Sequence, residues 1–131
     1  MKIKVSVFFV AAALLAAVTA YSHHSFAGTY ILEKTQTIEG KVVQLQIRNP
    51  HSFIHVEVVD ESGKPIRWSV EGGSAAQLAP QDDKPQLKVG DPLRVTGNPA
   101  RSAEAHRMRL VRMVRPSDGW NWGNEPGQVV Q

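Results

Sequence analysis

Histidines are the side chains of this 131-residue chain that best fit metal chemistry, because the sequence contains no cysteine. His23 and His24 are adjacent near the N-terminus, His51 and His55 are four residues apart, and His106 lies far along the chain. Imidazole nitrogens bind copper, nickel and zinc. These histidines define the candidate site, and its geometry depends on how the N-terminus is processed.

The first twenty or so residues have the three parts of a secretory signal peptide. Lys2 and Lys4 give a positive start, an uncharged apolar run spans 5–18, and small residues follow up to Ala20. The run is shorter than the ~20 apolar residues of a membrane span. We therefore expect a cleaved signal peptide within residues 1–22. The mature protein would be periplasmic or secreted, in a Gram-negative envelope, without a stable membrane span.

Two cleavage sites fit the small-residue rule, one after Ala20 and one after Ser22. Cleavage after Ala20 makes His23 the third residue, where amine, amide and imidazole nitrogens can surround Cu(II) or Ni(II) in a plane. Cleavage after Ser22 makes His23 the first residue, whose amine and imidazole can chelate one copper ion together. We predict a Cu(II) site with His23 as the anchor and with His24 and His51 as further ligands.

The second pair of histidines follows an Asn-Pro step at Asn49, which is typical of a turn or a strand start. His51 is therefore expected to begin a strand. His55 lies about 13 Å further along such a strand, too far to share one ion with His51. We expect Asn49 to have a structural polar role, and His55 to pair across a hairpin with Arg67 or Ser69.

Alternating apolar and polar residues predict strands over 37–48, 52–59, 66–71, 93–96 and 106–114. Ile38 and Val43 fall on opposite faces of the first strand, and a bulge at Gly40 would bring both to one core. A turn is expected at 60–63. A short helix is expected over 74–78, begun by Ser74 and stopped by Pro80.

These elements predict an all-β fold, a small five-stranded antiparallel barrel of the oligonucleotide/oligosaccharide-binding (OB) type with one short helix. A short sandwich is the alternative. The expected domains are the signal peptide at 1–22, a histidine-bearing segment at 23–36, the barrel at 37–115 and a flexible tail at 116–131.

Charge and motifs exclude several functions. Without Lys2 and Lys4 the mature chain keeps 13 basic and 12 acidic side chains, so we do not expect nucleic-acid binding. Phosphate-binding glycine loops and hydrolase motifs are absent from the sequence. Glu39, Glu57 and Glu71 lie on separate expected strands, so no acid/base pair is predicted. We expect Glu71 to orient a metal-binding histidine by accepting a hydrogen bond from its other ring nitrogen. We expect the protein to bind a ligand rather than to catalyse a reaction, and a copper oxidase is the enzymatic alternative.

Four blocks together resemble a family of small exported bacterial proteins of unknown function. They are His-His-Ser-Phe-Ala at 23–27, Asn-Pro-His at 49–51, Trp-Ser-Val-Glu at 68–71 and Gly-Ser at 73–74. The resemblance extends to about residue 114. In that family the His-His-Ser-Phe block sits at the cleavage point, which implies that His23 is the first mature residue. The resemblance also implies a compact β-barrel. It gives no established activity.

A metal-free interaction module is the alternative function. Its barrel would present Phe53, His55 and the arginines of 107–112 to an envelope protein or an anionic ligand. His51 and Glu71 would then serve the fold through buried hydrogen bonds.

Overall fold

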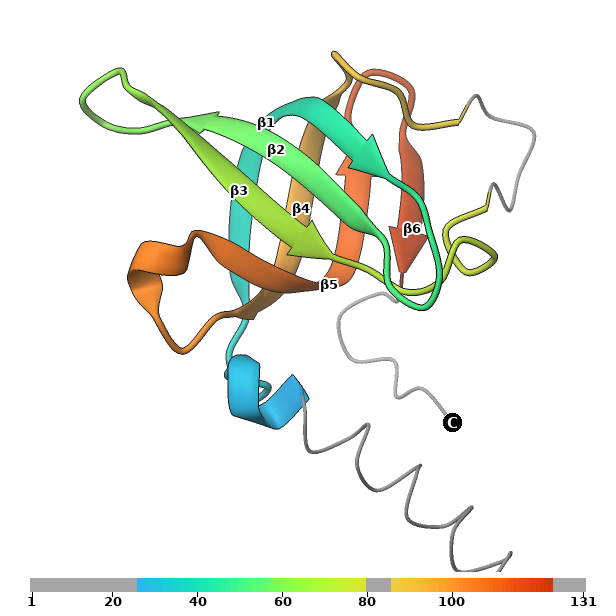
Figure 1. The fold of residues 1–131 in the computed structure, drawn as a ribbon. Helices are drawn as coiled ribbons and strands as arrows, with labels where there is room; N and C mark the ends of the chain where they lie inside the picture. The colour runs from blue at the N-terminus through green and yellow to red at the C-terminus, as the bar shows by residue number, and fades with distance from the viewer. Residues whose placement is uncertain (1–25, 80–85, 124–131) are drawn as a thin grey trace, which may run out of the picture.

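The computed structural model describes residues 26–79 and 86–123, so the expected signal peptide, His23 and His24 lie outside the described residues. Within these ranges no helix is long and apolar enough to cross a membrane. A helical turn at 26–29 precedes the strands, and a short 3₁₀ helix, η1 (Ala103–Ala105), lies between β4 and β5 (Figure 1). The strands are β1 (Gln36–Gln46), β2 (Phe53–Val59), β3 (Pro65–Glu71), β4 (Pro92–Pro99), β5 (Arg107–Arg115) and β6 (Trp120–Gly123).

Five of these strands form a closed barrel in the order β3-β2-β1-β4-β5, with β5 pairing back onto β3. The closing pair is parallel and brings Ser69 beside Arg107 and Glu71 beside Arg109. The predicted five-stranded all-β barrel is confirmed, but the prediction that every pair is antiparallel is wrong. A ring of five strands cannot alternate direction all the way round, so at least one pair must be parallel. The assignment to the OB type stays a prediction.

Strand β1 belongs to both halves of the barrel, because its first part pairs with β4 and its second part with β2. The register shifts between Val42 and Gln44, so the bulge lies three residues beyond the predicted position at Gly40. Val42, rather than Val43, is therefore buried together with Ile38. Gly40 instead allows a close strand contact, since a Cβ there would lie 2.1 Å from the Glu57 carbonyl oxygen.

Inward-facing apolar side chains fill the barrel. Each of the strands β2 to β5 contributes buried apolar residues, and Val56, Val70, Val95 and Met108 are fully buried. The predicted helix over 74–78 is wrong, because this segment forms hydrogen-bonded turns. Among the described residues, only the Leu78 amide makes a hydrogen bond of the α-helical kind here, to the Ser74 carbonyl at 3.2 Å, so the turn does not continue as a helix.

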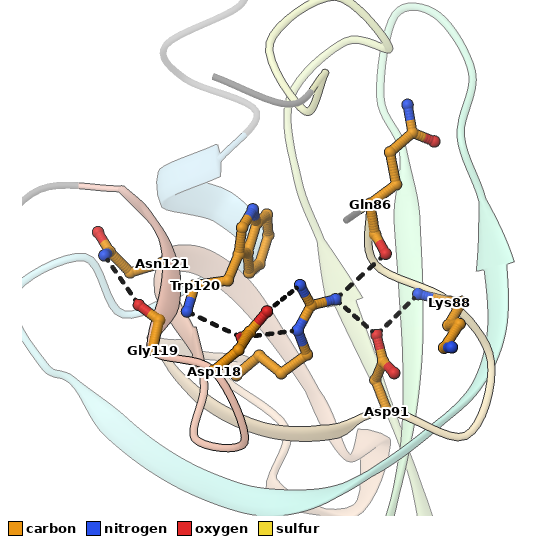
Figure 2. A network of polar contacts seen from close by, with 8 residues as sticks. Gln86, Lys88, Asp91, Asp118, Gly119, Trp120 and Asn121 are labelled. Carbon is orange, nitrogen blue, oxygen red and sulfur yellow. Dashed lines mark hydrogen bonds and ion pairs between the residues drawn. The ribbon is translucent and has the colours of Figure 1, made fainter. Parts of the chain in front are cut away.

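The segment after β5 was expected to be a flexible tail from residue 116, yet 120–123 form strand β6 along β5. Arg115 is buried at the start of this connection and donates hydrogen bonds to Asp91 at 2.8 Å and to Asp118 at 2.8 and 3.0 Å (Figure 2). Its guanidinium also lies 5.4 Å from the centre of the Trp120 ring. The arginine thus ties the 86–91 loop and β6 to the barrel.

Gly40→Ala tests the close contact between β1 and β2. The added methyl group meets a backbone oxygen that cannot move without bending the sheet, so we expect the free energy of unfolding to fall by about 3 kcal/mol. Urea denaturation of the mature protein measures this. Gly28→Ala is the matched control, because a Cβ there meets nothing within 4 Å. Equal midpoints for the two variants would contradict the contact.

Candidate functional site

The centre of the site is Glu71, the last residue of β3, of which only 9% is exposed. Its neighbour Val70 points into the barrel, so Glu71 points outward from the wall. The carboxylate is nevertheless buried, because the N-terminal segment crosses the wall here and the Tyr30 hydroxyl donates a hydrogen bond to Oε2. The site therefore lies between the barrel and the chain that leads into it.

The Tyr30 hydroxyl and the Arg107 guanidinium both donate hydrogen bonds to Oε2 of Glu71. Arg107 Nη2 donates to Glu71 Oε2 at 2.6 Å, and Arg107 Nε donates to the Tyr30 hydroxyl oxygen at 2.7 Å. Burial, followed by the hydrogen bond to Glu71, raises the pKa of Tyr30 well above its ordinary value of 10.0. Tyr30 thus stays a protonated donor, and the three side chains form a closed polar cluster.

His51 faces the other oxygen of Glu71. Its Nδ1 lies 3.7 Å from Glu71 Oε1, is buried and has no hydrogen-bond partner among the described residues. This distance is too long for a hydrogen bond. The side chain is 40% exposed although Nδ1 is buried, so the accessible part of the ring lies away from Nδ1. Nδ1 therefore faces the protein.

The loop between β1 and β2 fixes the backbone of His51. Ser52 is fully buried, and its hydroxyl donates to the Arg48 carbonyl at 3.0 Å and accepts from the Arg48 amide at 3.1 Å. Its own carbonyl accepts from the Gly72 amide at 2.8 Å, which joins this loop to the end of β3. Asn49 Oδ1 accepts a hydrogen bond from the Ala75 amide, in the turn after β3, at 3.1 Å, so Asn49 joins this loop to that turn.

An open cleft of about 340 Å³ lies beside His51 and Glu71. Phe26 packs edge-on against the His51 ring, with 5.3 Å between the ring centres, and Trp122 of β6 also lines the cleft. Arg109 lies 5.0 Å from the centre of the Phe26 ring. The cleft thus joins a histidine, a carboxylate, two aromatic rings and a guanidinium.

The structure brings together two of the predicted site residues, His51 and Glu71, while His23 and His24 lie outside the described residues. His55 pairs with Ser69 across the β2–β3 hairpin, at the expected place, and does not line the cleft. Within 26–79 and 86–123 no group of three metal-binding side chains occurs. A three-ligand metal site here would need at least one ligand from outside these ranges.

Three residues of the site escaped the sequence analysis: Tyr30, Ser52 and Arg107. The sequence assigned the arginines of 107–112 only to a surface that could meet a partner, whereas Arg107 is part of the Glu71 cluster. No local pattern reveals this, since Arg107 and Glu71 meet only through the parallel closure of the barrel. Ser52 had a weak signal, its place directly after the Asn-Pro-His turn.

Fold and site together define a small closed β-barrel with a carboxylate-centred polar cluster where the N-terminal segment meets the wall. The chain belongs to a family of unknown function, DUF6152, whose model it matches over residues 12–109. None of the curated proteins matches the chain. The expected membership of an uncharacterised family is thus confirmed.

Tyr30→Phe tests the cluster by removing one donor to a buried carboxylate. We expect the free energy of unfolding to fall by about 1.5–3 kcal/mol, as for hydrogen bonds to charged groups. A double-mutant cycle with Glu71→Gln should give a coupling of about 1 kcal/mol or more. Thr37→Val, which removes an exposed hydroxyl contact to Thr96, is the control. Additive effects of Tyr30→Phe and Glu71→Gln would contradict the cluster.

We expect the stability of the protein to depend on pH through His55. Burial, followed by the charge of Arg67, lowers its pKa below the ordinary value of 6.5. The unfolded chain then binds the proton more readily, so stability is lost as pH falls below about 6.5. His55→Gln should reduce the stability difference between denaturation near pH 7.5 and near pH 5. An NMR titration that places the His55 midpoint above 6.5 would refute the expectation.

Proposed function

We propose that the mature protein is a periplasmic Cu(II)-binding module. His23 supplies its imidazole and the terminal amine, His24 and the Nε2 of His51 complete the ligands, and Glu71 lies behind His51. The observation that carries the proposal is the buried Nδ1 of His51, which has no hydrogen-bond partner among the described residues and lies 3.7 Å from the Glu71 carboxylate.

The orientation of the His51 ring supports this role. Histidines that bind a metal nearly always donate their other ring N–H to a carboxylate, a carbonyl or water, which fixes the tautomer. A proton on Nδ1, directed at Glu71 Oε1, leaves the lone pair on Nε2. A small movement of the ring on metal binding would shorten the 3.7 Å separation to a hydrogen bond.

The path of the N-terminal segment also supports it. Phe26 contacts the His51 ring, and Tyr30 is tied to Glu71 and Arg107. His24 is two residues before Phe26, and two residues span at most about 7 Å. This distance is short enough for the His24 side chain to reach the His51 ring if the chain turns toward it, and His23 is one residue further.

His55 gives an internal comparison. It lies on the outer face of β2, and its Nε2 is buried without a hydrogen-bond partner among the described residues. His55 does not line the cleft beside Glu71. His55 therefore supplies the matched control for substitutions at His51.

Cu(II) titration of the secreted, processed protein tests the proposal, after its intact mass has fixed the first residue. His51→Ala should weaken Cu(II) binding at least about tenfold, and Glu71→Gln by about 10- to 100-fold, the range for residues that orient a ligand. Electron paramagnetic resonance should show fewer imidazole nitrogens on copper in His51→Ala.

His55→Ala should bind Cu(II) like the wild type in the same titration. A protein with one extra serine before the native first residue, which moves the free amine, should bind more weakly. If wild type, His51→Ala and His55→Ala bind Cu(II) equally, the site is not built from His51. The metal-free interaction module, in which the cluster only holds the N-terminal segment, is then the better account.

A further inference from the structure

A second cleft, of about 370 Å³, lies at one end of the barrel between the connection from β4 to β5 and the segment leading into β1. In Figure 1 the loop that carries η1 lies beside the segment that leads into β1. It shares no lining residue with the cleft beside His51. Its volume falls within the ~300–1,000 Å³ of small-molecule sites.

Basic side chains dominate this cleft: Lys34, Arg101, His106 and Arg107 line it. No Asp or Glu is among its described lining residues. Glu104, on the same loop, is exposed and accepts a hydrogen bond from Ser102 at 2.8 Å, and it does not line the cleft. The cleft therefore attracts negative charge.

The two guanidinium groups keep donors in reserve. Arg101 uses Nε for the Ala27 carbonyl at 2.9 Å, and no described residue accepts from its Nη atoms. Arg107 uses Nε and Nη2 for Tyr30 and Glu71, and no described residue accepts from Nη1. Guanidinium groups with open donors suit carboxylates and phosphates, which accept several N–H groups in a planar arrangement.

The wall of the cleft combines an aromatic surface with local strain. Trp68 and His106 pack edge to face with their ring centres 5.4 Å apart. His106 has a left-handed backbone, with φ of 42°, and its Nδ1 is buried without a partner among the described residues. Strained backbones and unpaired buried groups are costs that cluster at ligand sites.

We infer that this cleft binds a small organic anion, with its carboxylate or phosphate on Arg101 and Lys34 and a flat apolar part against Trp68. The site is independent of copper. It differs from a general anion patch, because Ile31 and Pro99 extend the apolar wall beside Trp68. A carboxylate and a phosphate share this recognition chemistry, so the test compares both.

The test titrates the processed, metal-free protein with benzoate, phenyl phosphate, inorganic phosphate and neutral benzyl alcohol. Indole N–H resonances in NMR report on Trp68, assigned through Trp68→Phe. We expect phenyl phosphate or benzoate to bind with a Kd of about 1 mM, which suits ligands of this size. Inorganic phosphate lacks the aromatic ring and benzyl alcohol lacks the anionic group, so each should bind at least about fivefold more weakly.

Lys34→Glu should weaken binding of the aromatic anion at least about fivefold, because it reverses a charge at the cleft. Lys64→Glu, in the exposed β2–β3 turn, makes the same change in net charge away from the cleft and should leave the Kd unchanged. His51→Ala should also leave it unchanged. Equal weakening by Lys34→Glu and Lys64→Glu, or no shift of the Trp68 signal by either aromatic anion, would overturn the inference.

Discussion

The burial of the Glu71 carboxylate is the constraint on which the site depends. A charge removed from water costs several kcal/mol unless other groups pair with it and donate to it. Here the compensation comes from Tyr30 and Arg107, which both donate hydrogen bonds to Oε2. Arg107 also donates to the Tyr30 hydroxyl oxygen. Because Tyr30 precedes β1, this compensation requires the N-terminal segment to cross the barrel wall at Glu71. One carboxylate thus determines where the chain enters the fold.

Strand β5 links this constraint to the rest of the barrel. Its first residue, Arg107, lies beside β3 because the barrel closes through a parallel pair, and its last residue, Arg115, holds the 86–91 loop and β6. Both arginines pair with buried carboxylates, at opposite ends of one strand. The closure of the barrel and the two ion-pair clusters therefore support one another, and β6 in turn supplies Trp122 to the cleft beside His51.

Local pattern predicts much of this fold and little of its long-range chemistry. Alternation correctly predicts the strands over 52–59 and 66–71, which form β2 and β3, and the proximity of Glu71 to a histidine was expected from the sequence. The bulge was placed at Gly40 because glycine is the usual sign of one, whereas this glycine allows a strand crossing. Tyr30 and Arg107 are 77 residues apart in sequence and meet only in the closed barrel, so no short pattern contains their contact.

The same geometry couples copper binding to the packing of the N-terminal segment, if the proposed ligands are correct. His51 belongs to the barrel, whereas His23 and His24 belong to the segment that Tyr30 anchors. A metal ion bound by both parts would cross-link them. Because coupling is reciprocal, packing of the segment on the barrel would strengthen metal binding by the same free energy by which bound metal stabilises the packed state. On that proposal, Tyr30 would contribute to metal affinity without touching the metal, by reducing the chain entropy that the ligands lose on binding. Two histidines on a free peptide would gain no affinity from packing. The dependence of Cu(II) affinity on packing of the segment would therefore distinguish a specific copper site from adventitious binding by an N-terminus.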